Sequence, residues 1–443
     1  MEPLFFSPVL ERECNPAFII GTTAPTGLID DTDLTSCVVP LTVTIVGGGP
    51  AGSAAAISLT RTGHRVTIID KATFPRDKCC GDGLTTGALR ILDELGFDRS
   101  RVADWQPCHE IELRTPSGRR VSLDLPTSQG LFAAIAPRQQ LDQALLNQAR
   151  DADAVVHEGT TFTSVDRNDD CVRISCIDAQ GATVTFESDY LIAADGMWSP
   201  VRKFLGVGID SYLGEWHAFR QYVSNVTGDA RTKLIVWFEP DLLPGYAWSF
   251  PLPGNRANIG FGVLRNAGHS VQFMKNAWND LKQREHVIAA LGPDAVFEDR
   301  HTAWPIPARV NDATKTLGRV LFVGDAVCAT DSLTGEGIGQ ALLTGQVAAE
   351  AIHNHGNSAA EVCSAYEKSM SHHFYADHRM STLLGKVLAR RRGAEGALRI
   401  VNMNSWTRRN FARWMFEDEP RAALFTPDRW HKGFLKRPGA FID

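Results

Sequence analysis

The sequence has no long hydrophobic run. None of its stretches approaches the roughly 20 consecutive apolar residues that a helix needs to span a bilayer. The first residues, MEPLFFSPVLEREC, lack a positively charged start followed by an apolar core, so we do not expect a secretory signal. The net charge of −6 gives no general attraction to nucleic acid, and no nucleic-acid partner is expected.

Metal-binding and disulfide patterns are also missing. The nine cysteines are scattered along the chain, and no two of them have the C-x-x-C spacing of zinc sites and thioredoxin-like redox couples. We therefore expect no bound metal. An odd number of scattered thiols is typical of the reducing cytoplasm, which is the expected location.

The composition is typical of a globular protein. With 44% hydrophobic and 22% charged residues, a chain of 443 residues is long enough to form two or three domains with a sizeable core. Residues 1–40 show no sustained hydrophobic period. We expect them to form an N-terminal extension, either a mobile arm or a strap over the surface.

Residues 42–70 predict a strand, a glycine-rich turn, a helix and a second strand. The apolar run 43–46 predicts a buried parallel strand, 53–61 a helix of small residues, and 65–69 the second strand. The turn contains three glycines in G-x-G-x-x-G spacing: Gly47, Gly49 and Gly52. This complete pattern, ending in an acidic residue, indicates dinucleotide binding far more strongly than the glycines alone.

Each of these glycines has a separate role in the pattern. Gly47 allows the tight turn, Gly49 lets the backbone approach a pyrophosphate, and Gly52 lets the helix pack closely on the strand. The free N–H groups at the start of the helix then face the phosphates. Asp70 ends the second strand, where it is expected to accept hydrogen bonds from a ribose 2′-hydroxyl.

The loop over residues 71–84 is expected to lie along the cofactor. Arg76 and Lys78 place positive charge beside the expected phosphates, and a Gly-Asp-Gly turn follows two cysteines. Such a turn suits a backbone that lies against the ring end of a long cofactor. Cys80 is either a contact at that end or a small packing residue.

Two later segments add contacts to the same cofactor. Arg138 begins a predicted helix, where a cation opposes the helix dipole, so we expect either a bound phosphate beside it or an exposed arginine. A buried strand ends in Asp325, which can bind sugar or ribityl hydroxyls. Glycines then open a helix over 338–353 and point its N–H groups at the cofactor. No strand–turn–helix unit surrounds this second glycine cluster, so we reject a second dinucleotide site there.

The remaining chain predicts the domain organisation. Residues 206–312 are rich in strands and aromatic side chains, which indicates a separate antiparallel sheet domain with a pocket. Strands within 105–135 are candidates to join that sheet. The dinucleotide-binding domain is expected to be discontinuous, over 41–205 and 313–355, and a helical region is expected over 356–443.

The helical C-terminal region is basic and aromatic. Between Lys386 and Arg437 there are 13 Lys and Arg against 5 Asp and Glu, a local charge of +8, so the rest of the chain carries −14. The segment 385–416 interleaves arginines with large apolar side chains. Such a segment is predicted to make peripheral contact with an anionic membrane surface, unless it is the solvated face of a packed helix.

Five motifs in order carry a resemblance to a known family: the glycine motif 47–52, F-P-R-D-K-C-C-G-D-G-L at 74–84, Asp195-Gly196, Y-A-W-S-F-P at 246–251, and G-D followed by L-T-G-E-G-I within 324–338. The chain resembles the geranylgeranyl reductase family of FAD-dependent oxidoreductases, which has the p-hydroxybenzoate-hydroxylase-like flavoprotein fold. The second and fourth motifs are the specific ones. The resemblance covers residues 41–415. It implies an α/β fold with a Rossmann-type FAD-binding domain.

The resemblance also implies which residues contact FAD and substrate. The ADP half is held by Gly47, Gly49, Ala51, Gly52 and Asp70, with further cofactor contacts from Lys71, Arg138 and Phe162. The ribityl and isoalloxazine half is held by Asp325, Gly337 and Ile338, and Cys80 and Gly81 lie by the flavin. A hydrophobic substrate channel is lined by Tyr246, Trp248 and Phe250. The chain departs from the family pattern at Cys79, where proline is usual, and in residues 1–40.

Family members closest in pattern reduce isoprenoid C=C bonds, for example in prenyl lipids. The first hypothesis is therefore that reduced FAD delivers a hydride from N5 and that a proton comes from solvent or a nearby donor, with Cys80 and Tyr246 as candidates. The external reductant is expected to be NAD(P)H or an electron-donor protein such as ferredoxin, because the sequence contains no second dinucleotide unit.

Two other functions fit the same scaffold. One is a monooxygenase that hydroxylates or epoxidises a hydrophobic natural product after reduced flavin meets O₂. Halogenation is disfavoured, because halogenases resemble W-x-W-x-I-P where this chain has Y-x-W-x-F-P at 246–251. The other is a flavoprotein that binds and presents prenylated partners without turnover.

Overall fold

The computed structural model describes residues 39–125, 131–208, 211–265, 270–416 and 420–430. The chain divides into two units, residues 1–39 and 40–443, and the second contains every described helix and strand. The expected N-terminal extension lies outside the described residues except for its last two positions. The end of the expected helical region, residues 431–443, also lies outside them.

A six-stranded sheet forms the centre of the nucleotide-binding part. Its strand order is β19-β20-β12-β1-β2-β8. The strands are β1 (Thr42–Val46), β2 (Arg65–Ile69), β8 (Val155–His157), β12 (Tyr190–Ala193), β19 (Thr316–Leu317) and β20 (Val320–Phe322). All neighbours pair in parallel except β19 and β20. Ile45, Ile68 and Leu191 have no exposed surface, as the continuous apolar runs predict for a parallel sheet covered on both faces.

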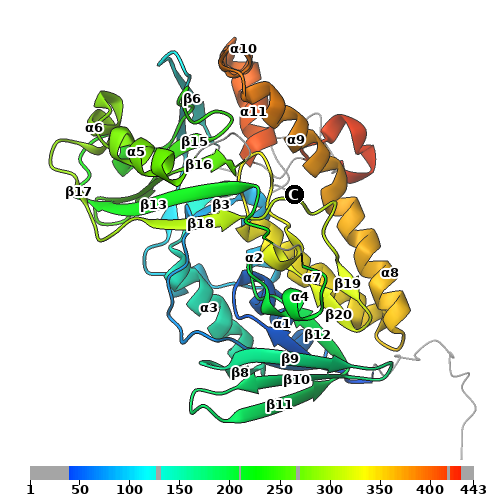
Figure 1. Cartoon of the computed structure of the whole chain (residues 1–443). Coiled ribbons are helices and arrows are strands. Elements are labelled where there is room, and N and C mark those ends of the chain that lie inside the picture. Colours follow the sequence, from blue (N-terminus) through cyan, green and yellow to red (C-terminus); the bar gives the residue numbers. More distant parts are fainter. Residues whose placement is uncertain (1–38, 126–130, 209–210, 266–269, 417–419, 431–443) are drawn as a thin grey trace, which may run out of the picture. The chain divides into compact units, whose positions relative to one another are not determined.

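Five of the described helices pack beside this sheet. They are α1 (Pro50–Arg61), α2 (Thr86–Glu94), α3 (Arg138–Asp151), α4 (Pro200–Phe204) and α7 (Ile338–His355). Two of them, α1 and α7, are rich in small residues. Helices α1 and α7 are in contact along their lengths (Figure 1). A Cβ atom on Gly345 of α7 would lie 2.2 Å from the carbonyl oxygen of Ala51, so this close approach requires glycine.

Two small sheets flank the central one. An antiparallel sheet consists of β9 (Thr161–Arg167), β10 (Val172–Ile177) and β11 (Thr183–Ser188). A second contains β3 (Gly83–Thr85), β4 (Gln106–Pro107) and β7 (Ala133–Ile135). Strand β3 begins at Gly83, the last residue of the Gly-Asp-Gly turn, and therefore anchors that turn on β7.

An eight-stranded sheet forms the second large layer. Its order is β17-β13-β16-β15-β14-β5-β6, and β18 also pairs with β13. The strands are β5 (Glu110–Arg114), β6 (Arg120–Asp124), β13 (Trp216–Ser224), β14 (Leu234–Trp237), β15 (Tyr246–Leu252), β16 (Arg256–Leu264), β17 (Val296–Phe297) and β18 (Thr302–Ile306). Pairing is antiparallel except between β14 and β5, which brings the hairpin β5–β6 into this sheet.

Two helices cover one side of the eight-stranded sheet: α5 (Val271–Leu281) and α6 (Glu285–Leu291) (Figure 1). Their core includes Trp237, Phe261 and Trp278, all nearly fully buried. The observed architecture confirms the expected α/β fold class with a parallel sheet, an antiparallel sheet and a helical C-terminal part. The expected domain boundaries stay predictions.

The C-terminal helices are α8 (Ala359–Met370), α9 (Ala376–Leu388), α10 (Arg391–Val401) and α11 (Ser405–Phe416), with a π-helical turn over Ser371–Tyr375. Helix α11 contacts β6, and Leu398, Val401 and Ala412 join the core of the β5–β6 hairpin. One side of the basic segment 385–416 is therefore packed against the sheet. None of the described helices has the length and apolar character that a bilayer crossing requires.

Candidate cofactor and substrate site

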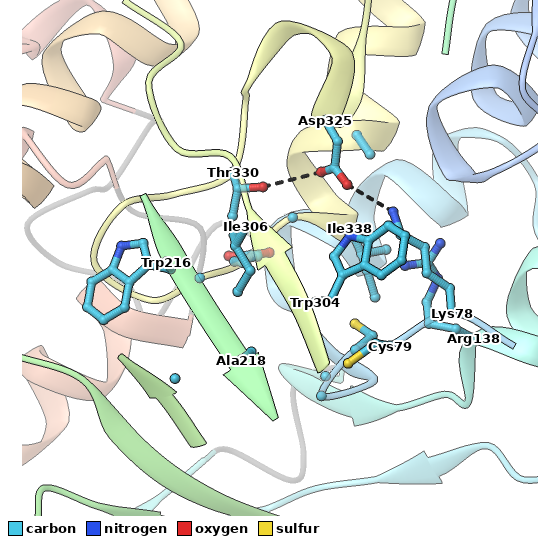
Figure 2. A pocket seen from close by; sticks show the side chains of 18 of the residues that line it. Lys78, Cys79, Arg138, Trp216, Ala218, Trp304, Ile306, Asp325, Thr330 and Ile338 are labelled. Carbon is cyan, nitrogen blue, oxygen red and sulfur yellow. Dashed lines mark hydrogen bonds and ion pairs between the residues drawn. The ribbon is translucent and has the colours of Figure 1, made fainter. Parts of the chain in front are cut away.

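A cavity of about 1020 Å³ is lined by both large sheets and by the C-terminal helices. It brings together all of the sequence-predicted site residues except Gly52, whose place is behind the turn. Figure 2 shows part of the lining: Lys78, Arg138 and Asp325 lie on one side, with the Trp304 indole beside Lys78, and Trp216 lies on the opposite side. The cavity thus joins a polar region to an apolar one.

The glycine turn has the geometry that its spacing predicts. Gly47 has a φ of +111°, and a Cβ atom there would lie 2.2 Å from the carbonyl oxygen of Ala194. A Cβ atom on Gly52 would lie 1.9 Å from the carbonyl oxygen of Gly47. Gly49 instead faces the cavity, where the nearest atom to an added Cβ is Arg76 Nη2 at 3.4 Å. The backbone at Gly49 is therefore open to a ligand.

Asp70 holds this turn from the end of β2. Its Oδ2 accepts a hydrogen bond from the Gly48 N–H at 2.8 Å, and its Oδ1 accepts one from the Ala72 N–H at 2.8 Å. Asp70 and Lys71 both line the cavity. The Asp70 carboxylate thus stabilises the turn and also faces the cavity. Its contact with a ribose stays a prediction.

Arg138 is buried and paired. Its guanidinium makes two hydrogen bonds of 2.7 Å to Asp142, one turn along α3, and Arg76 pairs with the same carboxylate at 3.0 Å. Asp142 therefore supplies the negative charge that we expected from a phosphate, and the alternative of an exposed arginine is wrong. Arg138 still lines the cavity, so a cofactor contact from its remaining N–H groups stays a prediction.

Asp325 is paired with Lys78 of the loop over residues 71–84. Its Oδ2 accepts a hydrogen bond from Lys78 Nζ at 2.9 Å, and Thr330 donates to Oδ1 at 3.4 Å (Figure 2). Burial alone raises the pKa of this carboxyl group, but Lys78 and Arg138 outweigh it and lower the pKa overall. Asp325 is therefore an ionised hydrogen-bond acceptor, as the expected contact with ribityl hydroxyls requires.

FAD fits the polar region of this cavity. Gly49 and Gly337 stand directly before helices α1 and α7, and among the described residues no side chain caps either start. Their free N–H groups attract anions. Lys71, Arg76 and Lys78 add positive charge along the same wall. These donors suit a pyrophosphate, and Asp70 and Asp325 suit the hydroxyls on either side of it.

The Gly-Asp-Gly turn packs under the aromatic face of β15. Cβ atoms on Gly81 and Gly83 would lie 3.1 and 3.2 Å from Phe250 Cε2. Across the sheet, a Cβ atom on Gly260 would lie 2.4 Å from the Trp248 ring. Glycine at these positions lets the turn and the neighbouring strand approach the two rings closely.

Tyr246, Trp248 and Phe250 alternate along β15 and all line the cavity. Tyr246 donates its hydroxyl proton to the Thr334 carbonyl, and burial raises its pKa. Burial also raises the pKa of the Cys80 thiol, which lines the cavity near Arg138. Both candidate proton donors are therefore protonated at neutral pH. The structure brings both to the cavity, and the role of each as proton donor stays a prediction.

Most of the apolar lining was not predicted from the sequence. The C-terminal helices contribute Leu384, Leu388, Leu398, Val401, Phe411 and Trp414, and other strands contribute Trp216 and Ile306. The amphipathic pattern of 385–416 was a signal for Leu388, Leu398, Val401, Phe411 and Trp414, but it does not say whether its apolar side meets a membrane or a cavity.

Comparison with known proteins agrees with this geometry. Residues 40–343 match the model of the FAD binding domain family. The menaquinone reductase of Mycobacterium tuberculosis is 34% identical over 327 residues, which cover 70% of this chain and 75% of that protein. The digeranylgeranylglycerophospholipid reductase 2 of Methanosphaera stadtmanae is 28% identical over 348 residues, which cover 75% of this chain and 84% of that protein.

The fold is shared with a solved structure. A geranylgeranyl bacteriochlorophyll reductase-like protein from Thermoplasma acidophilum superposes with a TM-score of 0.73 at 22% identity, over 87% of this chain and 98% of that chain. With the cavity, the family match and these relatives together, the chain belongs to the FAD-dependent oxidoreductases of the geranylgeranyl reductase family.

Proposed function

We propose that this protein reduces C=C bonds of an isoprenoid chain or a similar hydrophobic substrate. The observation that carries the proposal is a single cavity whose polar region suits FAD and whose apolar region is lined by aromatic and aliphatic side chains. Two relatives support it by name, since one is a menaquinone reductase and the other a digeranylgeranylglycerophospholipid reductase.

Bound and reduced FAD supplies the hydride in this reaction. The chain's own residues bind and orient both partners. Trp248 and Phe250 bury an apolar chain on the strand face, while Trp216, Ile306 and Trp414 exclude water around it. Because a prenyl chain offers few hydrogen-bonding groups, burial rather than polar contact is expected to supply the affinity.

The reductant and the membrane contact belong to the same proposal. NAD(P)H or an electron-donor protein such as ferredoxin reduces the flavin from outside, in the cytoplasm. The substrate reaches the cavity from an anionic membrane surface that the segment 385–416 contacts. Supporting this, Ile400, Met403 and Trp406 are 62, 68 and 69% exposed, and Arg391 and Arg399 are exposed nearby.

Anaerobic turnover tests the proposed reaction. The purified yellow protein is photoreduced without O₂ and then mixed with a geranylgeranyl lipid or menaquinone. We expect the flavin to reoxidise without O₂ and the product to gain two hydrogen atoms. Flavin that stays reduced until air is admitted, with a product that gains one oxygen atom, would contradict the proposal and identify a monooxygenase. Flavin that reductants do not reduce at a useful rate would identify a binding protein.

A further inference from the structure

The Gly-Asp-Gly turn carries a carboxylate that does not line the cavity. Asp82 is 0% exposed and has a φ of +65°. Its neighbours Cys80, Gly81 and Gly83 all line the cavity beside the expected flavin position. Asp82 therefore lies directly behind the backbone that faces the cofactor.

Three separate elements donate hydrogen bonds to Asp82. Its Oδ2 accepts one from the Tyr222 hydroxyl of β13 at 2.7 Å and one from Asn258 Nδ2 of β16 at 2.7 Å. Its Oδ1 accepts one from the backbone N–H of Arg138 at the start of α3, at 3.2 Å. A carboxylate has only acceptors and can satisfy all three, whereas an amide has a single acceptor oxygen.

Asn258 extends this network to the cavity wall. Its Nδ2 also donates to the Cys80 carbonyl oxygen at 2.8 Å. Its Oδ1 accepts from the Trp248 indole N–H at 3.3 Å. Asn258 thus binds both the turn beside the expected flavin position and the Trp248 indole in the apolar region. Its hydrogen bond to Asp82 fixes its orientation.

Charged groups surround the network without replacing any of its bonds. The Arg220 guanidinium lies 4.3 Å from the centre of the Tyr222 ring, and Arg256 lies 5.4 Å from it. Arg220 also pairs with Asp77 at 2.5 Å. Burial raises the pKa of Asp82 to about 6, although Arg220 and the bonds from Tyr222 and Asn258 oppose the rise. The Cys80 thiol also acts on Asp82, whereas Arg138 contributes its backbone N–H and directs its guanidinium to Asp142.

We propose that Asp82 is a positioning residue, which through Tyr222 and Asn258 holds the Cys80–Gly83 turn and the Trp248 indole in the geometry that the bound flavin and the substrate need. Protonation of Asp82 turns one of its two acceptor oxygens into a hydroxyl donor, so the group no longer suits three donors and the turn loosens when it is neutral. The inference rests on the proposed function only for its kinetic readout. The geometry of the turn is followed separately, by the absorption and fluorescence of the bound flavin.

The test compares Asp82→Asn and Tyr222→Phe with the unchanged FAD-loaded protein. Flavin absorption and fluorescence are recorded between pH 5 and 8. We expect a spectral transition near pH 6 in the unchanged protein and its loss in Asp82→Asn. In Tyr222→Phe the transition moves to higher pH by about one unit or more, because a bond that favours the carboxylate is gone. The kcat/KM for the prenyl lipid falls about tenfold in both variants.

Two controls make the outcome decisive. Asp195 also has a pKa raised by burial to about 6, but Tyr222→Phe does not touch it, so only the Asp82 transition moves in that variant. Asp98→Asn, at an exposed turn, should change neither spectrum nor rate. A transition that is unchanged in both test variants would overturn the proposal. If Asp82→Asn does not fold, the pH of the spectral transition in Tyr222→Phe alone tests the proposal, and an unchanged pH overturns it.

Failure of the proposed function is seen separately. A prenyl lipid that does not reoxidise the reduced flavin of the unchanged protein contradicts the reductase. The spectral transition and its response to Tyr222→Phe still support or overturn the role of Asp82.

Discussion

Four of the aspartates at or beside the cavity have pKa values that their surroundings shift, two upward and two downward. Burial raises the pKa of Asp82 and Asp195 to about 6. Burial also acts on Asp325 and Asp331, but Lys78 and Arg421 respectively outweigh it and lower the pKa of each. The two raised groups are therefore the ones that change charge in mildly acidic solution.

The raised pKa of Asp82 predicts a pH-dependent effect on stability. In the unfolded chain the group has its ordinary pKa of 3.8, so between pH 4 and 6 the folded protein holds a proton that the unfolded chain has released. Its contribution to the free energy of unfolding thus falls as pH rises through this window and stays low above it. A pKa raised from 3.8 to about 6 corresponds to about 3 kcal/mol.

Asp82→Asn removes this pH dependence. We expect the free energy of unfolding of the variant, measured relative to the unchanged protein by urea denaturation, to increase by up to about 3 kcal/mol between pH 4 and pH 7. Asp195 contributes equally to both proteins and cancels. A difference that does not change with pH would show that Asp82 has its ordinary pKa in the folded protein.

Tyr246→Phe tests one of the two candidate proton donors. Because the hydroxyl is bonded to the Thr334 carbonyl, we expect its loss to loosen the loop before α7 and weaken FAD binding by about tenfold. The rate of C=C reduction at saturating FAD should fall by less than that. Fluorescence titration with FAD and anaerobic stopped-flow mixing measure the two effects. A large loss of rate with unchanged FAD affinity would instead identify Tyr246 as the donor.

At the scale of elements, glycine positions set how closely the layers approach. Gly260 lies opposite Trp248 in the pairing of β15 with β16, and it leaves room for the indole. Gly345 brings α7 against α1 at Ala51. Because α1 and α7 both begin at the polar part of the cavity, their separation sets the distance between the two helix starts that face the cofactor.

Gly345→Ala should therefore weaken both the fold and cofactor binding. Its Cβ would lie 2.2 Å from a backbone oxygen, and backbone cannot move aside as a flexible side chain does. We expect a loss of about 1–3 kcal/mol in stability and a lower FAD content, measured by thermal melting and by flavin absorbance after purification. Gly396→Ala in α10 is the matched control, because an added Cβ meets nothing within 4 Å there. Equal behaviour of the two variants would contradict close helix packing as the cause.

At the scale of the whole molecule, the basic C-terminal segment has two different sides. Leu398, Val401 and Phe411 line the cavity, whereas Ile400 and Trp406 are exposed. Deleting the segment would remove part of the cavity wall together with the exposed residues. Point substitutions on the exposed side are therefore the cleaner test of membrane contact.

The triple variant Ile400→Ser, Met403→Ser and Trp406→Ser should lose binding to vesicles of phosphatidylglycerol and phosphatidylcholine. We expect at least a tenfold loss in a flotation assay, because about 0.8 kcal/mol is lost for each CH₂ group that no longer enters the lipid. The control is Val155→Ser, Ile177→Ser and Val296→Ser, which are exposed apolar positions on other elements. Unchanged binding of the first variant would contradict the proposed contact. Binding of the unchanged protein should also weaken with salt.

Local patterns in the sequence determined the nucleotide-binding unit. The strands at 42–46 and 65–69, the turn at Gly47 and the close packing at Gly52 follow from apolar periodicity and glycine spacing within one short stretch. Steric and hydrogen-bonding rules act over a few residues there, so no distant contact is needed to infer them. The resemblance added FAD and the aromatic strand at 246–250.

Only the tertiary structure decided the contacts between residues far apart in the chain. Asp82 meets Tyr222 140 positions later and Asn258 176 positions later, and nothing in the local sequence of any of them indicates the others. The same holds for Leu398, whose pattern fits a membrane or a packed core equally well until the β5–β6 hairpin is seen beneath it. Periodicity shows that a face is apolar, but the partner that buries it is chosen by the free energy of the complete fold.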